Sequence, residues 1–162
     1  MKKTVICPHC HKPFSKYCNP TPTTDVIIYN PQKGIVIIKR KNTPVGYALP
    51  GGFIDEGEQA EKAAAREMLE ETALTVKLDG LLGVYSKPDR DPRQHTLSVV
   101  YVGTPEVPEK LKAGDDAAEA AFYKLDNLPA PIVFDHQKII NDFKEFLAGK
   151  RTLAAIDNSS QS

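Results

Sequence analysis

Three glutamates are spaced so that one face of a helix could hold a metal ion. From Glu58 to Thr72 the chain contains no Gly or Pro and is rich in good helix formers. At 100° per residue, Glu67, Glu70 and Glu71 fall on one stripe of this helix. Close like-charge pairs destabilise a helix by about 0.2–0.5 kcal/mol each. We therefore expect a hard divalent cation, which prefers oxygen ligands, to neutralise the stripe.

A simpler interpretation of these glutamates is an acidic helix face that contacts only water, because charge clusters commonly do so. The other side of the helix carries Ala65, Met68, Leu69 and Thr72, which we expect to pack on a sheet. Pro50 and the two glycines after it predict a turn into the helix.

The spacing of the whole stretch resembles the signature of the Nudix hydrolases. That signature reads Gly-x5-Glu-x7-Arg-Glu-U-x-Glu-Glu-x-Gly-U, where U is aliphatic, and the chain follows it from Gly52 through Glu58 to Leu74. One position departs, because Ala73 stands where the family has Gly. We expect this departure to affect the exit from the helix, where a left-handed residue is common, and not the carboxylates.

The resemblance implies an α/β fold, an α/β/α sandwich with a mixed sheet, for a chain with a short Cys-containing segment at its start. It implies a Nudix pyrophosphohydrolase in which Mg²⁺ or Mn²⁺ assists water in splitting a nucleoside diphosphate linked to another group. Arg66 is expected to pair with Glu58 and to fix the loop against the helix. The metal ligands implied are the carbonyl of Gly51 and the carboxylates of Glu67, Glu70 and Glu71.

The general base stays open at this point. Glu67 is one candidate, within the motif. The others, Asp115, Asp116 and Glu119, precede the last expected strand, and we favour Glu119 among them.

A proline after the motif bears on the substrate. Pro88 lies 15 residues beyond Ala73, and a proline near that place, with the run from Asp89 to His95, resembles the ADP-ribose pyrophosphatases of the family. The resemblance implies hydrolysis of ADP-ribose to AMP and ribose 5-phosphate. Alternatives are an oxidised nucleoside triphosphate or a dinucleotide as substrate, or a non-catalytic domain that senses a nucleotide.

Two basic segments could contact the phosphates. Arg40 follows an apolar run, and Arg90, Arg93 and His95 lie in a loop rich in Pro and charge. Arginine suits bidentate phosphate contacts, so all four are candidate substrate ligands. Solvated loops are the alternative for both segments.

The first residues contain a candidate zinc site. Cys7 and Cys10 have the two-residue gap that lets two thiolates bind one tetrahedral metal, and Cys18 is a third candidate ligand, with His9 or His11 as the fourth. A metal-free turn, or a remnant of a zinc ribbon, explains the same residues.

The remaining pattern indicates one domain between two short segments. We expect residues 1–22 to form the Cys-containing segment and linker, 23–150 the Nudix domain and 151–162 a polar tail. Apolar β-branched runs predict strands, and an amphipathic pattern predicts a final helix. The strands are expected at 26–29, 34–39, 47–50, 74–78, 81–86, 97–102 and 120–125, and the final helix at 132–148.

The composition limits the partners. Lys+Arg and Asp+Glu number 21 each, so no overall basic field favours nucleic acid, and an adaptor that binds RNA or protein through residues 39–41 is the disfavoured rival. No run of 18 apolar residues predicts a membrane span, and three cysteines near one end do not make a disulfide framework. We expect a cytoplasmic protein that binds a small nucleoside diphosphate derivative, with a homodimer as one candidate assembly.

Overall fold

The computed structural model describes residues 2–114 and 117–157. Asp115 and Asp116, two of the candidate bases, lie outside the described residues, as does the end of the tail. The strands are β1 (Lys2–Ile6), β2 (Pro13–Tyr17), β3 (Thr21–Asn30), β4 (Gly34–Arg40), β5 (Tyr47–Ala48), β6 (Gly51–Phe53), β7 (Val76–Tyr85), β8 (Thr96–Pro105) and β9 (Ala117–Tyr123). The helices are α1 (Ala60–Thr72), the short 3₁₀ helix η1 (Pro108–Lys110) and α2 (His136–Leu147).

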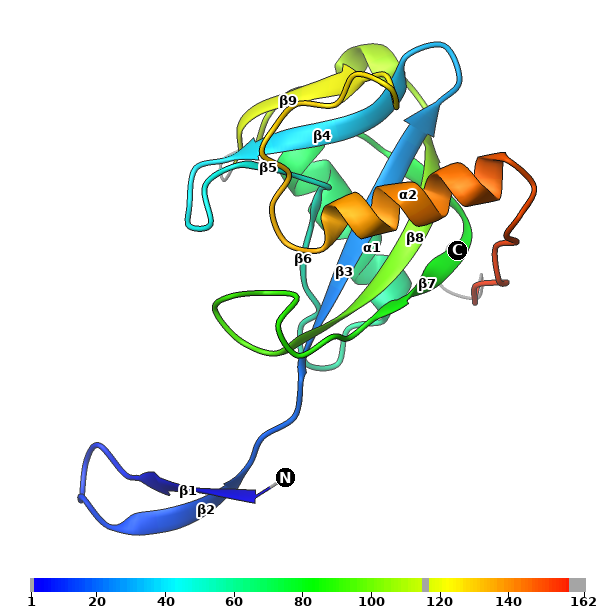
Figure 1. Ribbon diagram of the computed structural model, residues 1–162. Coiled ribbons are helices and arrows are strands. Elements are labelled where there is room, and N and C mark those ends of the chain that lie inside the picture. The colour runs from blue at the N-terminus through cyan, green and yellow to red at the C-terminus, as the bar shows by residue number, and fades with distance from the viewer. Residues whose placement is uncertain (1, 115–116, 158–162) are drawn as a thin grey trace.

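Within the described residues, seven strands form a mixed sheet. Its main path runs β5-β4-β3-β8-β7, with β6 paired to β3 and β9 paired to β4. The β3–β8 pair is parallel and the other pairs are antiparallel. β3 lies at the centre of this arrangement (Figure 1), so residues near its start can contact both β6 and β8.

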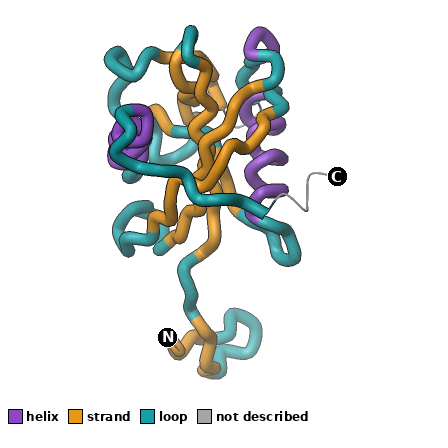
Figure 2. Tube along the Cα trace, turned by 90° about the vertical axis from the view of Figure 1, so that its right-hand side faces the viewer, coloured by secondary structure: helices purple, strands orange, loops and turns teal. Residues whose placement is uncertain are grey.

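Helices cover both faces of the sheet, α1 on one side and α2 on the other (Figure 2). Successive residues of β3 alternate between these layers, as the pleat of a strand requires. Val26 and Ile28 pack in the cluster that contains Met68 of α1, whereas Ile27 packs in the cluster that contains Phe143 of α2. This is the expected α/β/α sandwich.

Several boundaries differ from the sequence prediction, three of them near the site or the core. β7 runs unbroken through Asp79 and Gly80, because shifts of register against β8 absorb the bend that was expected there. The final helix begins at His136 rather than at residue 132, since the preceding residues bond with Tyr47. Thr21 and Pro22, expected as linker, already pair with β8.

The buried face of α1 also differs from the helical-wheel prediction. Met68 and Thr72 are buried, as expected, and Ala64 joins them at the preceding turn. Ala65 is exposed and Leu69 is 58% exposed, because their stripe lies about 100° around the helix from the sheet.

The segment after α2 packs back onto the sheet. Ala154 and Leu81 exchange two backbone hydrogen bonds of 2.9 Å, and Leu153 packs against the core cluster of α2. In the described part of the chain, neither helix has the length and apolar character that a membrane span requires.

The replacement of the motif glycine by Ala73 leaves a testable strain. Ala73 ends α1 in the left-handed region, with φ 55° and ψ 19°, and its N–H donates to the Leu69 carbonyl. An L-residue in that region costs about 1–2 kcal/mol that Gly avoids. We expect Ala73→Gly to raise the free energy of unfolding by about 1 kcal/mol, measured by urea denaturation.

The matched control is Ala65→Gly, at an exposed position inside the same helix. There glycine costs backbone entropy without relieving strain, so we expect a loss of about 1 kcal/mol. If both substitutions destabilised the protein alike, Ala73 would carry no strain.

Candidate active site

A cavity of about 390 Å³ lies against the C-terminal half of α1 and the start of β3. Its volume is in the range of small-molecule sites, roughly 300–1,000 Å³. Its polar lining combines acidic and basic side chains from segments distant in sequence. They are Asp25, Arg40, Asp55, Arg66, Glu67, Glu71, Arg90, Asp91, Arg93 and His136.

Arg66 joins the loop before α1 to the helix. Its Nε and Nη2 donate to the two oxygens of Glu58, both at 2.9 Å, so the expected pair is present and bidentate. Nη2 also donates to the Phe53 carbonyl at 3.0 Å, and Nη1 donates to Glu67 at 2.8 Å. One guanidinium therefore fixes the loop backbone and a cavity carboxylate together.

Glu67 and Glu71 are the two motif carboxylates that line the cavity. Burial raises the pKa of Glu67, and the hydrogen bond from Arg66 opposes that shift. Burial raises the pKa of Glu71 to about 8, although the N–H of Gly51 donates to its Oε2 at 2.8 Å. A cation bound beside the two groups would favour their charged forms.

Glu70 lies apart from these two. Its side chain is 59% exposed, does not line the cavity and lies 3.4 Å from Arg66. Among the described residues, no group of three or more His, Cys, Asp or Glu side chains is arranged to hold a metal ion. The donors inside the cavity still fit a hard divalent cation, because Glu67 and Glu71 present carboxylate oxygens beside the backbone of Gly51.

A buried ionic network forms another part of the cavity wall. Arg90 donates to both oxygens of Asp135 at 3.0 and 2.7 Å and to Thr96 at 3.0 Å, and it lies 3.5 Å from Asp25. Its side chain is only 4% exposed. Arg90 still lines the cavity, but its guanidinium is held by partners within the protein, so its expected contact with phosphate or ribose stays a prediction.

The same network holds the strand that leads to the motif. The N–H of Leu49 donates to Nδ1 of His136 at 2.9 Å, and Nε2 of His136 lies 3.6 Å from Asp25. Ser98 donates to Asp25 from β8, and β3 pairs Asp25 with Gly51. Nothing in the sequence pattern indicated Asp25 or Asp135, because their partners lie far along the chain.

Phe134 brings two of the predicted basic side chains together. The guanidinium carbons of Arg40 and Arg93 lie 5.0 and 5.4 Å from its ring centroid. Phe134 has φ 60°, an uncommon backbone state for a bulky residue that is often retained at functional sites. Arg93 is further held by Asp91 at 2.7 Å and Arg40 by the Pro44 carbonyl at 3.0 Å.

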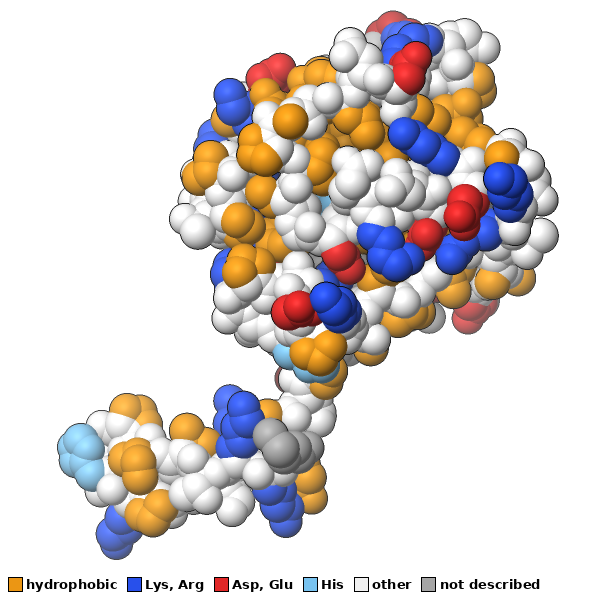
Figure 3. Space-filling view, viewed as in Figure 1, with side chains coloured by type: hydrophobic (Ala, Val, Ile, Leu, Met, Phe, Trp, Pro, Cys, Tyr) orange, Lys and Arg blue, Asp and Glu red, His pale blue; other side chains and the backbone are white. Residues whose placement is uncertain are grey.

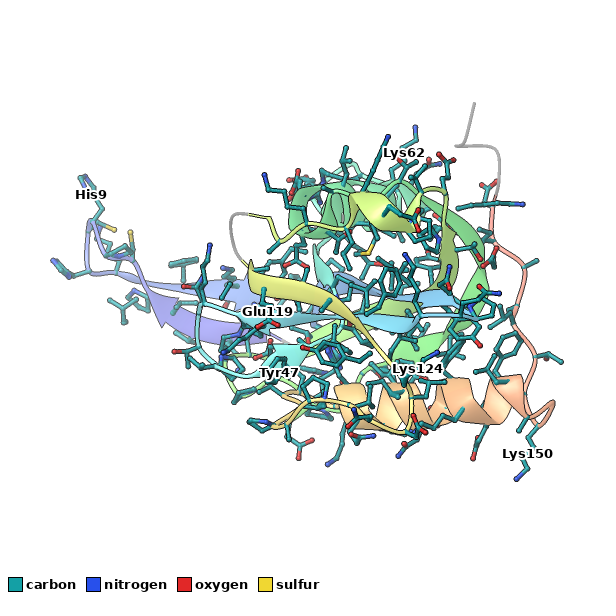
Figure 4. The ribbon with its side chains drawn as sticks, turned by 90° about the horizontal axis from the view of Figure 1, so that it is seen from above. His9, Tyr47, Lys62, Glu119, Lys124 and Lys150 are labelled. Atoms are coloured by element: carbon teal, nitrogen blue, oxygen red, sulfur yellow. The ribbon has the colours of Figure 1, made fainter. Side chains whose placement is uncertain are left out.

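Two predicted site residues do not reach the cavity. His95 is exposed, and its Nε2 lies 3.0 Å from the Ser86 carbonyl. The side chain of Glu119, on β9, lies near Tyr47 (Figure 4) and accepts a 3.5 Å hydrogen bond from Tyr123. Neither residue lines the cavity, so neither expected role is supported by position.

The three cysteines lie outside the cavity, and the described residues do not gather them into one site. The register of β1 with β2 pairs Lys2 with Tyr17 and Ile6 with Pro13. Cys18 therefore lies at the opposite end of the hairpin from Cys7 and Cys10, about 17 Å away at 3.3 Å per residue. One zinc ion cannot bind all three within a single chain.

Comparison with known proteins agrees with the motif and the fold. The NUDIX domain model matches residues 19–143. The chain belongs to the NUDIX family. The family match begins just before β3 and includes the whole cavity lining up to His136.

Named relatives of this NUDIX chain include hydrolases of different substrates. It is 47% identical to "ADP-ribose pyrophosphatase" of Methanocaldococcus jannaschii, over 91% of this chain and 86% of that protein. It is 36% identical to "Putative 8-oxo-dGTP diphosphatase" of Bacillus subtilis, over 74% and 76%. The crystal structure of a mutT/nudix family protein from Listeria innocua is 35% identical, with a TM-score of 0.65, over 82% of this chain and 98% of that one.

The buried His136 gives this NUDIX domain a testable dependence on pH. Burial lowers the pKa of His136, so the folded protein keeps it neutral where the unfolded chain, with a pKa of about 6.5, takes up a proton. This stabilisation is fully present above the pKa of the unfolded chain. It is lost as the pH falls from there toward the lower pKa of the folded protein. We expect the free energy of unfolding to fall by up to about 1.4 kcal/mol per pH unit in this range.

His136→Gln keeps an acceptor for the Leu49 N–H and removes the titration. Denaturant unfolding at about pH 7.5 and pH 5.5 should show a smaller decrease for His136→Gln than for the wild type. His11→Gln, at an exposed histidine, is the control and should behave as the wild type. Equal decreases in all three proteins would exclude His136 as the source.

Proposed function

We propose that this NUDIX hydrolase uses a divalent cation to split ADP-ribose into AMP and ribose 5-phosphate. The observation that carries the proposal is one cavity that holds Glu67 and Glu71 together with Arg40 and Arg93. Carboxylates can hold a cation on the diphosphate, and guanidinium groups can hold phosphate oxygens directly. The identity of 47% with a relative named ADP-ribose pyrophosphatase supports the choice of substrate.

The reaction adds one water molecule across the diphosphate. The oxygen of water forms a bond to one phosphorus, the bridging P–O bond breaks, and the bridging oxygen leaves on the other phosphate. A bound Mg²⁺ or Mn²⁺ would neutralise phosphate oxygens and lower the pKa of coordinated water. We assign Glu67, Glu71 and the Gly51 carbonyl to that cation, and Glu70 would join them only by leaving Arg66.

Glu67 is also our candidate for general base. It lines the cavity, whereas Glu119 does not, and a general base must lie within reach of the attacking water. Arg66 orients Glu67 through the 2.8 Å hydrogen bond and is itself held by Glu58. Arg66 and Glu58 thus act by positioning rather than by touching substrate.

A nucleoside triphosphate is the second candidate substrate, because the chain is also 36% identical to a relative named as an 8-oxo-dGTP diphosphatase. The test incubates the full chain with ADP-ribose, 8-oxo-dGTP and a dinucleotide, with Mg²⁺, with Mn²⁺ and after chelation. We expect AMP and ribose 5-phosphate from ADP-ribose with the largest kcat/KM, and no products after chelation. Binding of ADP-ribose without turnover would identify a nucleotide sensor instead.

Replacing the motif glutamates separates their roles. We expect Glu67→Gln and Glu71→Gln to lower kcat by about 10²-fold or more, because each removes a charge inside the cavity. Glu70→Gln should cost less, since its side chain lies outside the cavity. Glu145→Gln, at an exposed acid of α2, is the control for loss of one charge. Full activity in Glu71→Gln would refute the metal assignment.

Phe134 is expected to act on substrate binding through the two arginines. Phe134→Ala removes the ring beside Arg40 and Arg93, a contact worth about 0.5–2 kcal/mol per pair. We expect KM for ADP-ribose to rise roughly tenfold with a smaller change in kcat, and Phe134→Tyr to restore KM. An unchanged KM in Phe134→Ala would show that the arginines do not need the ring.

A further inference from the structure

The β1–β2 hairpin stands apart from the NUDIX domain. It projects beyond the start of β3 (Figure 1), and all ten residues of its two strands are exposed. An isolated two-stranded hairpin is at best marginally stable in water, and needs a further layer or a cross-link. Val5, Ile6, Phe14 and Tyr17 are among its exposed apolar side chains. We therefore expect the hairpin to need a stabilising contact with something other than its own two strands.

Its turn is built like one half of a metal site. Cys7 and Cys10 lie in the turn with two residues between them, and both thiols are free. The turn is closed by Cys7 N–H to the Lys12 carbonyl at 3.0 Å and His11 N–H to the Cys7 carbonyl at 2.9 Å. Backbone N–H groups of Cys10 and His9 donate to the Cys7 sulfur, so the turn itself fixes the position of this thiol.

The chain supplies only this half. A tetrahedral zinc site needs four ligands, and Cys18 lies at the far end of the hairpin by the register of β1 with β2. No third His, Cys, Asp or Glu joins Cys7 and Cys10 in a metal-binding group within residues 2–114 and 117–157. Two further ligands must come from another molecule if the site is to close, and a second pair of Cys7 and Cys10 would supply them.

We propose that two copies of this chain meet at their hairpin tips and share one Zn²⁺, held by Cys7 and Cys10 of each copy. The soft thiolates and the two-residue spacing select zinc with tetrahedral geometry. The tip is the part of the hairpin farthest from the domain, as the position of His9 in Figure 4 shows. Two tips can therefore approach while the NUDIX domains stay apart.

Charge on the hairpin fits this arrangement. Four thiolates and one Zn²⁺ carry a net charge of −2, which needs nearby cations. Residues 1–18 include four lysines, Lys2, Lys3, Lys12 and Lys16, and no Asp or Glu, and basic side chains without acidic ones are visible over the hairpin in Figure 3. Lys12 is closest to the site, directly after the turn.

The test uses the full chain in a thiol-free reductant, which excludes intermolecular disulfides. The chain is first stripped with a chelator and then titrated with Zn²⁺ or Co²⁺, and its mass is followed by sedimentation. We expect one Zn²⁺ per two chains, conversion from monomer to dimer on adding zinc, and reversal by the chelator. Co²⁺ should give the thiolate-to-metal absorption band of a tetrahedral four-sulfur site.

Matched variants identify the ligands. The double variant Cys7→Ser with Cys10→Ser should neither bind zinc nor dimerise, whereas Cys18→Ser, His9→Ala and His11→Ala should behave as the wild type. One zinc per monomer, no zinc binding, or a dimer that survives chelation and the double substitution would each overturn the proposal. Because the tip lies outside the cavity, the double variant should keep its metal-dependent hydrolysis, so the inference stands or falls independently of the proposed substrate.

Discussion

The site depends on a single guanidinium that ties an irregular loop to a regular helix. Arg66 contacts Glu58, Glu67 and the carbonyl of Phe53 at once. A loop rich in glycine would otherwise sample many conformations, and Arg66 restricts it by bonds at fixed angles. The geometry of β6 beside α1, and with it the place of Gly51 next to Glu71, follows from that restraint.

A second constraint is the buried ionic network around Arg90. Arg90 binds Asp135 and approaches Asp25, while His136 accepts the N–H of Leu49. These groups are buried, and a buried ion pair that loses one partner is strongly destabilising. The network therefore joins β3, the loop before β8 and the start of α2 into one wall, which is why the cavity keeps a defined shape on the side away from the motif.

Sequence reasoning succeeded where the interactions are local. The motif acids and the Arg66–Glu58 pair lie within a few turns of one another, so the spacing of the family motif indicated them. The pattern of apolar residues indicated a sheet with helices on both faces. Sequence reasoning could not identify the partner of Arg90, since a loop arginine can face solvent or a distant acid, and Asp135 is 45 residues away. Nothing in the sequence indicated the left-handed backbone of Phe134, because the apolar pattern around it predicted a helix.

The cavity draws its lining from residues between Thr23 and His136. The contacts of the β1–β2 hairpin are, by contrast, all local in sequence. The groups assigned to the cation, Gly51, Glu67 and Glu71, are also close in sequence, whereas Phe134 and His136 line the cavity from a segment far along the chain. Unfolding of the hairpin thus need not disturb the cavity, because none of the described hairpin residues lines it.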